Sequence, residues 1–357
     1  MRPFSYTRPS TISEAISLLE SGGATIGESN GESDSIGARS DRGNLRGDDR
    51  PRLLAGGTDL LPLMKGDIAE PAHLIDIKRL PELDDTILMS PEGITIGALA
   101  SLAKLEDDPL VCSMHPALAE AASLAATPQL RNMATIGGNL LQRPRCWYFR
   151  SDKVNCWLKG GEDCPARDGE NQHHAIFSVS PCVAAHPSDL ATALLALGAS
   201  VEIQGPAGKR TLDLDDFFAP PTDERRLENV LEPTEVIVSI TIPTASGAAQ
   251  SAYLKAMDRK VWAFAQVAVG AMLVIQDQRI TEARLVLGGV SPIPWRATDA
   301  EGLLTGAAPG RELFDQVAQV ALQGAVPLSR NGYKVPLAKA LITRALMAAS
   351  TPKDVSA

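Results

Sequence analysis

Four of the five cysteines lie close together in the sequence, where their thiols could bind a metal centre. They fall within residues 146–182 at a spacing of C-x9-C-x7-C-x17-C. This spacing matches neither the short CxxC pairs of common zinc sites nor the cysteine runs of ferredoxins. Four thiolates can nevertheless bind a cubane iron–sulfur cluster or a tetrahedral zinc ion, and a set of unrelated buried thiols is the third alternative. The four are Cys146, Cys156, Cys164 and Cys182, whereas Cys112 stands apart and is interpreted as a core thiol.

Two Gly-Gly turns are candidates for binding a dinucleotide. Gly56-Gly57-Thr58-Asp59 follows a short apolar strand and precedes a helix-like run, and Gly137-Gly138-Asn139 occurs later in the chain. Glycines let the backbone approach a diphosphate closely, and the N–H groups of a turn can surround it. The Rossmann pattern GxGxxG is absent from these turns. Each turn alone is more typical of a structural element, but together with Ser188-Asp189 they favour a ligand that needs several separated backbone contacts.

The periodicity of apolar residues predicts the elements that would position these groups. Glu14 follows Thr11 by three residues, as in a capping box, and predicts the start of a helix over 10–22. Alternation predicts strands, and longer one-faced stretches predict helices. The expected strands are 73–77, 93–98, 133–142, 235–243, 264–275 and 283–290. The expected helices are 116–126, 310–324 and 335–349, with a helix leading into a strand over 187–205.

Composition and charge exclude several classes of protein. The chain has 357 residues, of which 44% are hydrophobic, and a formal net charge of -9. That charge argues against a nucleic-acid platform and against binding to an anionic membrane. The sequence contains neither an apolar run of the roughly 20 residues that a membrane span needs nor a secretory signal. The protein is therefore expected in the cytoplasm by its own sequence, or in the periplasm if a partner subunit carries the export signal.

Two polar segments divide the chain. Residues 24–51 are rich in Gly, Ser, Asp and Arg, and they predict a mobile polar insertion. Residues 219–233 are Pro-rich and charged, and we expect a domain boundary there, with a first domain over 1–220 and a second over 232–350. In the second domain the expected strands precede the expected helices, which indicates an α+β fold.

Six motifs occur in an order that resembles the flavoprotein subunit of the xanthine dehydrogenase and carbon monoxide dehydrogenase family. They are LLAGGTDLLPLMK, LIDIKRLPEL, GITIGALAS, TPQLRNMATIGGNLLQ, PSDLATALLALGA and LGGVSPIPWRA. The resemblance covers nearly the whole chain apart from the insertion at 24–51. It implies an α+β fold in which a two-lobed FAD-binding domain of the vanillyl-alcohol-oxidase type is followed by a small α+β domain.

The resemblance also implies which residues bind FAD. The segment from Leu53 to Leu61 is expected to surround the diphosphate, and Ile237 is expected to pack near the adenine or the flavin ring. No catalytic acid, base or nucleophile is expected on this chain. The implied cofactor-binding residues are Leu53, Leu54, Ala55, Gly56, Gly57, Thr58, Asp59, Leu60, Leu61, Thr135, Gly138, Asn139, Asp189, Ile237 and Lys255.

The cysteine window is similar to that of the periplasmic-type aldehyde oxidoreductases, whose FAD subunit carries an additional 4Fe–4S cluster. The segments RCWYFR, GENQHHAIF and HPSD carry this similarity. It implies that Cys146, Cys156, Cys164 and Cys182 bind the cluster. His173 and His174 are interpreted as hydrogen-bonding groups near the cluster or the flavin.

The function implied by the family is electron transfer rather than substrate oxidation. A large subunit would hold the molybdenum cofactor, and a small subunit with 2Fe–2S clusters would pass electrons to this FAD, in a heterotrimer that could dimerise. Two alternatives remain. One is a stand-alone FAD oxidoreductase of the same superfamily, and the other is a zinc-stabilised scaffold that binds no flavin.

Overall fold

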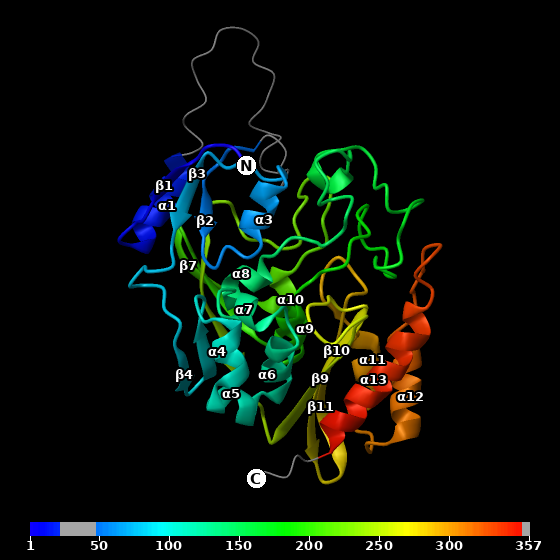
Figure 1. The fold of residues 1–357 in the computed structure, drawn as a ribbon. Helices are drawn as coiled ribbons and strands as arrows, with labels where there is room; N and C mark the ends of the chain where they lie inside the picture. The colour runs from blue at the N-terminus through cyan, green and yellow to red at the C-terminus, as the bar shows by residue number, and fades with distance from the viewer. Residues whose placement is uncertain (22–47, 352–357) are drawn as a thin grey trace.

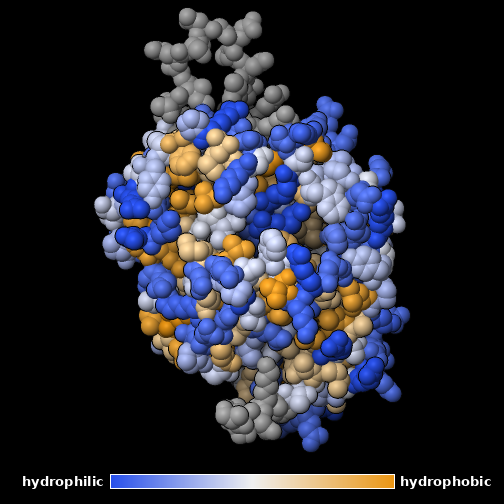
Figure 2. All heavy atoms as spheres, viewed as in Figure 1, coloured by the Kyte–Doolittle hydropathy of each residue, from blue (hydrophilic) through white to orange (hydrophobic). Residues whose placement is uncertain are grey.

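The computed structural model describes residues 1–21 and 48–351, so residues 24–47 of the expected polar insertion lie outside the described residues. The described residues form three sheets with helices packed around them (Figure 1). None of the helices in these ranges has the length and the apolarity that a membrane span requires. On the face shown in Figure 2, apolar side chains form small separate groups among hydrophilic ones.

The first sheet is small and parallel, with the strand order β1-β3-β2. Helix α1 (Ile12–Ser21) packs its apolar face against this sheet in one hydrophobic cluster. Thr11 Oγ1 accepts a hydrogen bond from the N–H of Glu14 at 3.1 Å, so the predicted helix start is confirmed. The other elements of this lobe are β1 (Ser5–Thr7), β2 (Arg52–Leu54), α3 (Leu60–Lys65) and β3 (His73–Asp76).

The second sheet has five antiparallel strands in the order β4-β5-β8-β6-β7. Its strands are β4 (Ile87–Ser90), β5 (Gly93–Gly97), β6 (Ser200–Gly205), β7 (Gly208–Asp213) and β8 (Val236–Pro243). Helices from the segments between these strands share one hydrophobic core with the sheet. They are α4 (Leu102–Asp107), α5 (Pro109–Met114), α6 (Pro116–Ser123), α8 (Ile136–Leu140), α9 (Asp189–Ala196) and α10 (Leu214–Phe217).

Strand β8 follows the expected boundary at 219–233 in the sequence, yet it lies in the middle of the second sheet. Ile240 of β8 pairs with Ile96 of β5 on one side and with Val201 of β6 on the other. A strand whose two neighbours both come from the first domain belongs to the same folding unit. We therefore propose that the boundary lies between β8 and the next strand, rather than at 219–233.

The third sheet is antiparallel, with the order β12-β11-β10-β9. Helices pack on both of its faces, which explains why β10 is buried along most of its length and reads as one continuous apolar run. Gly270 of β10 lets helix α9 approach, because a Cβ there would lie 2.9 Å from the carbonyl oxygen of Thr192. The elements are β9 (Ala249–Ala256), β10 (Val267–Gln276), β11 (Arg279–Gly288), β12 (Trp295–Arg296), α11 (Thr298–Leu304), α12 (Arg311–Val320) and α13 (Lys334–Ser350). The predicted α+β arrangement, with strands before helices, is confirmed.

Two expectations from the sequence are wrong. Residues 133–142 do not form a strand, because Thr135 caps the short helix α8 and donors of this segment bond to Ala98 and Ala100 instead. Cys112 is not a core thiol, because it is exposed on α5, where the neighbouring Val111 takes the buried position.

Candidate cofactor cavity and cysteine site

A cavity of about 310 Å³ lies where segments of the first two sheets meet. This volume is within the range of small-molecule sites, roughly 300–1,000 Å³. Three segments contribute most of the lining, and they fall within 50–60, 134–145 and 227–237. The first Gly-Gly turn, the second Gly-Gly turn and strand β8 thus converge on one space, although they are far apart in the sequence.

The first Gly-Gly turn is shaped by close contact with the segment before α8. A Cβ at Gly56 would lie only 1.9 Å from the carbonyl oxygen of Met133, so only glycine permits this approach. Gly57 has a φ of +72°, which glycine adopts without strain. Among the described residues, no group accepts a hydrogen bond from the N–H of Gly57 or Thr58, and both residues line the cavity. Unpaired donors at a cavity wall suit an anionic ligand such as a diphosphate.

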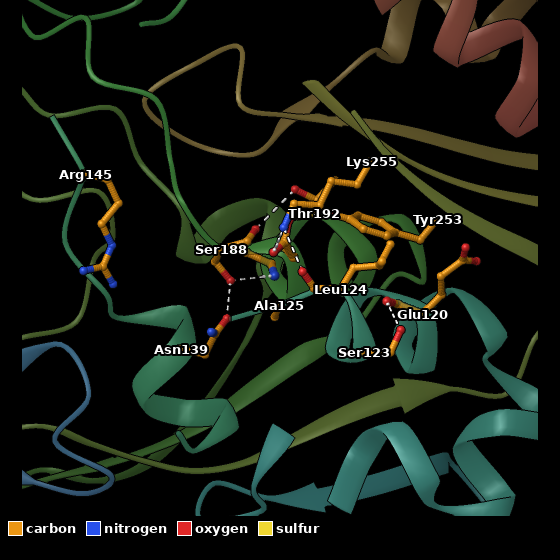
Figure 3. A network of polar contacts seen from close by, with 12 residues as sticks. Glu120, Ser123, Leu124, Ala125, Asn139, Arg145, Ser188, Thr192, Tyr253 and Lys255 are labelled. Carbon is orange, nitrogen blue, oxygen red and sulfur yellow. Dashed lines mark hydrogen bonds and ion pairs between the residues drawn. The ribbon is translucent and has the colours of Figure 1, made fainter. Parts of the chain in front are cut away.

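The second Gly-Gly turn uses its own donors internally. Thr135 Oγ1 accepts a hydrogen bond from the N–H of Gly138 at 3.2 Å, and the N–H of Asn139 bonds to the carbonyl oxygen of Thr135 at 2.8 Å. These three residues all line the cavity. The side chain of Asn139 is also fixed, because its Oδ1 accepts a hydrogen bond from Ser188 Oγ at 2.6 Å (Figure 3).

Asp189 and Lys255 are brought together, but they do not line the cavity. Lys255 Nζ lies 2.8 Å from Asp189 Oδ2 and donates to the carbonyl oxygen of Leu124 at 3.0 Å. The hydroxyl of Tyr253 donates to Asp189 Oδ1 at 2.6 Å. Burial raises the pKa of Asp189, and Lys255 opposes this shift. Tyr253 is a partner that sequence reasoning missed, although it lies two residues before Lys255 on β9.

Most of the remaining cofactor candidates line the cavity. Leu53, Ala55 and Leu60 do so, as does Ile237 of β8, whereas Leu61 does not. The contacts of these residues with a cofactor stay a prediction. The predicted residues that line the cavity are Leu53, Leu54, Ala55, Gly56, Gly57, Thr58, Asp59, Leu60, Thr135, Gly138, Asn139 and Ile237.

Three arginines beside the cavity were missed from the sequence. Arg143 and Arg145 line it, and Arg150 lies behind them against Asp59. Arg145 and Arg150 each pair with Asp59 Oδ1, at 2.7 Å and 2.8 Å. The only signal in the sequence was the density of arginines in the segment 143–150.

The four cysteines of the window are held in a largely buried region without regular structure apart from the 3-10 turn Trp157–Lys159. Burial raises the pKa of Cys146 to about 12. The neighbouring thiol of Cys182 lowers the pKa of Cys164, whereas the pKa of Cys182 is raised. His174 Nε2 lies 3.2 Å from Cys146 Sγ, and the N–H of Ala184 donates to Cys182 Sγ at 3.4 Å.

Neighbouring main-chain N–H groups lower the pKa of Cys146, Cys156 and Cys164, against the effect of burial. Such donors stabilise thiolate charge in metal sites. Within residues 1–21 and 48–351, however, no three His, Cys, Asp or Glu side chains converge on a point that could hold one metal ion. The four thiols and their surroundings therefore fit ligation of a metal by thiolates, but these residues do not converge on a single ion.

Comparisons with known proteins agree with this arrangement. Residues 41–245 match the family described as the FAD binding domain in molybdopterin dehydrogenase, and residues 252–349 match the CO dehydrogenase flavoprotein C-terminal domain. The chain is 38% identical to the aldehyde oxidoreductase FAD-binding subunit PaoB of Escherichia coli K12, over 83% of this chain and 90% of that one.

A second relative is the carbon monoxide dehydrogenase medium chain of Hydrogenophaga pseudoflava, which is 29% identical over 97% of this chain and 96% of its own. A solved structure of carbon monoxide dehydrogenase from that organism superposes with a TM-score of 0.72 at 28% identity, covering 98% of this chain and 97% of the other. On these matches the chain belongs to the FAD-binding subunits of the xanthine dehydrogenase and carbon monoxide dehydrogenase family.

Proposed function

We propose that this chain passes electrons from the 2Fe–2S clusters of a partner subunit through FAD to an external acceptor, as one subunit of a molybdenum hydroxylase of the aldehyde oxidoreductase type. FAD, when bound, accepts single electrons and can discharge one or two, which suits a relay. The observation that carries the proposal is the cavity walled by both Gly-Gly turns, where the N–H groups of Gly57 and Thr58 have no acceptor among the described residues. Family membership supports the same cofactor.

The chain's own residues would bind and orient the cofactor rather than transfer protons to a substrate. We place the diphosphate against the turn at 56–58, with Thr135 and Asn139 also in the cavity wall. Asp189 and Lys255 lie outside the cavity lining, so we propose that they act on the flavin end through Ser188, which begins helix α9 and holds Asn139 in place.

We propose that Cys146, Cys156, Cys164 and Cys182 bind a 4Fe–4S cluster. Main-chain N–H groups favour the thiolate form of each of these cysteines, and burial keeps the metal-free thiol of Cys146 protonated. The positive charge of iron favours the thiolates that ligation requires. A 4Fe–4S cluster takes one thiolate on each of four irons, so its ligands need not converge on one point, as the ligands of a zinc ion must. His174 would donate a hydrogen bond to Cys146 from 3.2 Å.

The proposed partners are a large subunit with the molybdenum cofactor and a small subunit with 2Fe–2S clusters, in a heterotrimer. The names of the relatives support this, because one is called a FAD-binding subunit and another a medium chain. The compartment follows the partner subunits: the cytoplasm, or the periplasm where one of them carries an export signal.

The test is an absorption spectrum of anaerobically purified protein, with flavin, iron and zinc quantified on the same sample. For this chain purified alone, we expect a flavin spectrum over a broad brown shoulder, with about four irons per FAD; a heterotrimer would contain the iron of the partner's 2Fe–2S clusters in addition. FAD without iron would reject the cluster and keep the flavoprotein, and protein without flavin would reject the proposed function. Co-purification of two further subunits separates an electron-transfer subunit from a stand-alone FAD oxidoreductase, and zinc in a colourless protein would indicate a scaffold.

A further inference from the structure

Asp59 has an unusual role for a residue at the start of a helix. It occupies the N-cap position of α3, yet its side chain makes no capping hydrogen bond. Both carboxylate oxygens instead face the segment that leads into the cysteine window. Oδ1 lies 2.7 Å from Arg145 and 2.8 Å from Arg150, and Oδ2 accepts a hydrogen bond from the N–H of Arg143 at 2.9 Å. Asp59 therefore joins the first Gly-Gly turn to the cysteine window.

We call Asp59, Arg143, Arg145 and Arg150 the arginine clamp. Its arginines surround Cys146, which lies directly after Arg145. The N–H of Arg150 donates to the carbonyl oxygen of Cys146 at 2.9 Å, which closes a turn around this cysteine. The guanidinium of Arg150 also donates to the carbonyl oxygens of Pro144 and Arg143, each at 2.8 Å. The same side chain thus holds the turn at Cys146 and the carboxylate beside the cavity.

Burial holds this connection in place. The fully buried ring of Phe149 contacts two guanidinium groups of the clamp, with its centroid 5.2 Å from that of Arg143 and 5.8 Å from that of Arg150. Arg143 also pairs with the buried Glu228 at 3.1 Å. Arg143 and Arg145 line the cavity, and their guanidinium groups suit an anionic ligand there.

We propose that the arginine clamp couples the cysteine site to the retention of FAD. An ordered turn at Cys146 holds Arg150 and Arg145 on Asp59, and this fixes the Gly-Gly-Thr turn against which we place the diphosphate. When the cysteine site loses its ligand, the turn at Cys146 loosens and the FAD loop loses its anchor. The proposal rests on the proposed function, because it takes the cavity as the FAD site and the cysteines as ligands of an iron–sulfur cluster.

The first experiment compares Arg150→Met with Arg279→Met in the purified complex. Arg279 is a matched control, because its guanidinium also donates to a main-chain carbonyl oxygen, that of Gly306, and it lies outside both the cavity lining and the cysteine window. We measure the dissociation constant of FAD by fluorescence titration and the iron content of each sample. Arg150→Met is expected to weaken FAD binding at least tenfold in protein that retains its iron, and Arg279→Met is expected to bind FAD like the unaltered protein. Unchanged FAD affinity in Arg150→Met would overturn the proposal.

A second measurement perturbs the cysteine site itself. In the complex, Cys156→Ser removes one proposed ligand and leaves the 2Fe–2S clusters of the partner subunit in place, while Cys112→Ser at an exposed position is the control. Coupling predicts that the FAD dissociation constant rises at least tenfold in Cys156→Ser, and that Cys156→Ser adds little further loss to Arg150→Met, because the two perturbations break one connection. An FAD affinity that does not respond to Cys156→Ser, at a lowered iron content, would overturn the coupling.

The two proposals fail in different ways. If the unaltered complex contains FAD and no iron beyond that of the partner's 2Fe–2S clusters, the proposed 4Fe–4S cluster is wrong, and the effect of Arg150→Met on FAD affinity alone decides whether the clamp anchors the loop. If the unaltered complex contains no FAD, the proposed function itself fails.

Discussion

Replacing Gly56 with alanine should weaken FAD binding, because the turn that we assign to the diphosphate has no room for a methyl group. An added Cβ would lie 1.9 Å from the carbonyl oxygen of Met133, and real Cβ atoms essentially never approach closer than 3.0 Å. The two segments would therefore have to separate by at least about 1 Å. Both are main chain, so no flexible side chain can absorb the shift. Overpacking of this kind typically costs about 1–3 kcal/mol.

We expect this strain to appear mainly in cofactor binding, since the strained turn forms the cavity wall. A loss of about 1.4–2.8 kcal/mol corresponds to a FAD dissociation constant roughly 10–100 times larger. The assay is a fluorescence titration of the flavin-free protein with FAD, combined with denaturant unfolding. Gly302→Ala is the matched control, because a Cβ there meets nothing within 4 Å and alanine favours the helix α11. The reasoning is refuted if Gly56→Ala binds FAD as tightly as the control.

Three further predictions concern buried polar groups and cysteines. Tyr253→Phe leaves Asp189 Oδ1 without its 2.6 Å donor, and unfolding in denaturant should show a loss of about 1–3 kcal/mol. Burial lowers the pKa of His186 to about 3 from its ordinary 6.5, so the unfolded chain binds a proton that the folded chain excludes between these values. The contribution of His186 to the free energy of unfolding is thus fully present above pH 6.5 and falls as the pH drops, by up to about 1.4 kcal/mol per pH unit. His186→Asn should make the free energy of unfolding less dependent on pH, as measured by urea titrations at pH 7 and 5. Cys156→Ser should lower the iron content, whereas Cys112→Ser, at an exposed position, should leave it unchanged.

Local signals in the sequence were sufficient for much of the fold. The cap at Thr11 and the apolar face of α1 follow from side chains within one turn of each other, and the structure contains both. The long apolar run of β10 is buried on both faces, so its strand is also visible locally. The order of the family motifs along the chain then predicted that the two Gly-Gly turns share one site, although the turns are far apart in the sequence.

Features that depend on distant partners were not visible in the same way. The Pro-rich segment at 219–233 has the composition of a linker, but β8 after it pairs with strands from much earlier in the chain. The segment 133–142 is apolar enough for a strand, yet Thr135 caps a helix there, and the packing of Gly137 against Ala98 decides the outcome. Composition indicates the structure that a segment prefers on its own, whereas the structure of these two segments depends on contacts with distant parts of the chain.

The same limit explains why the resemblance named Asp59, Asp189 and Lys255 as cofactor residues without indicating the ion pairs that they form. Asp189 and Lys255 are 66 positions apart, and Asp59 and Arg150 are 91 positions apart. In both pairs the carboxylate is already occupied by a cation from a distant segment. An ionised carboxylate has several lone pairs, so pairing with a cation does not exclude a contact with a ligand. We propose that both carboxylates act mainly by fixing the position of the cation. Asp59→Asn would separate the two roles: loss of FAD affinity together with a loosened turn at Cys146 supports positioning, whereas loss of affinity with an intact turn supports direct contact.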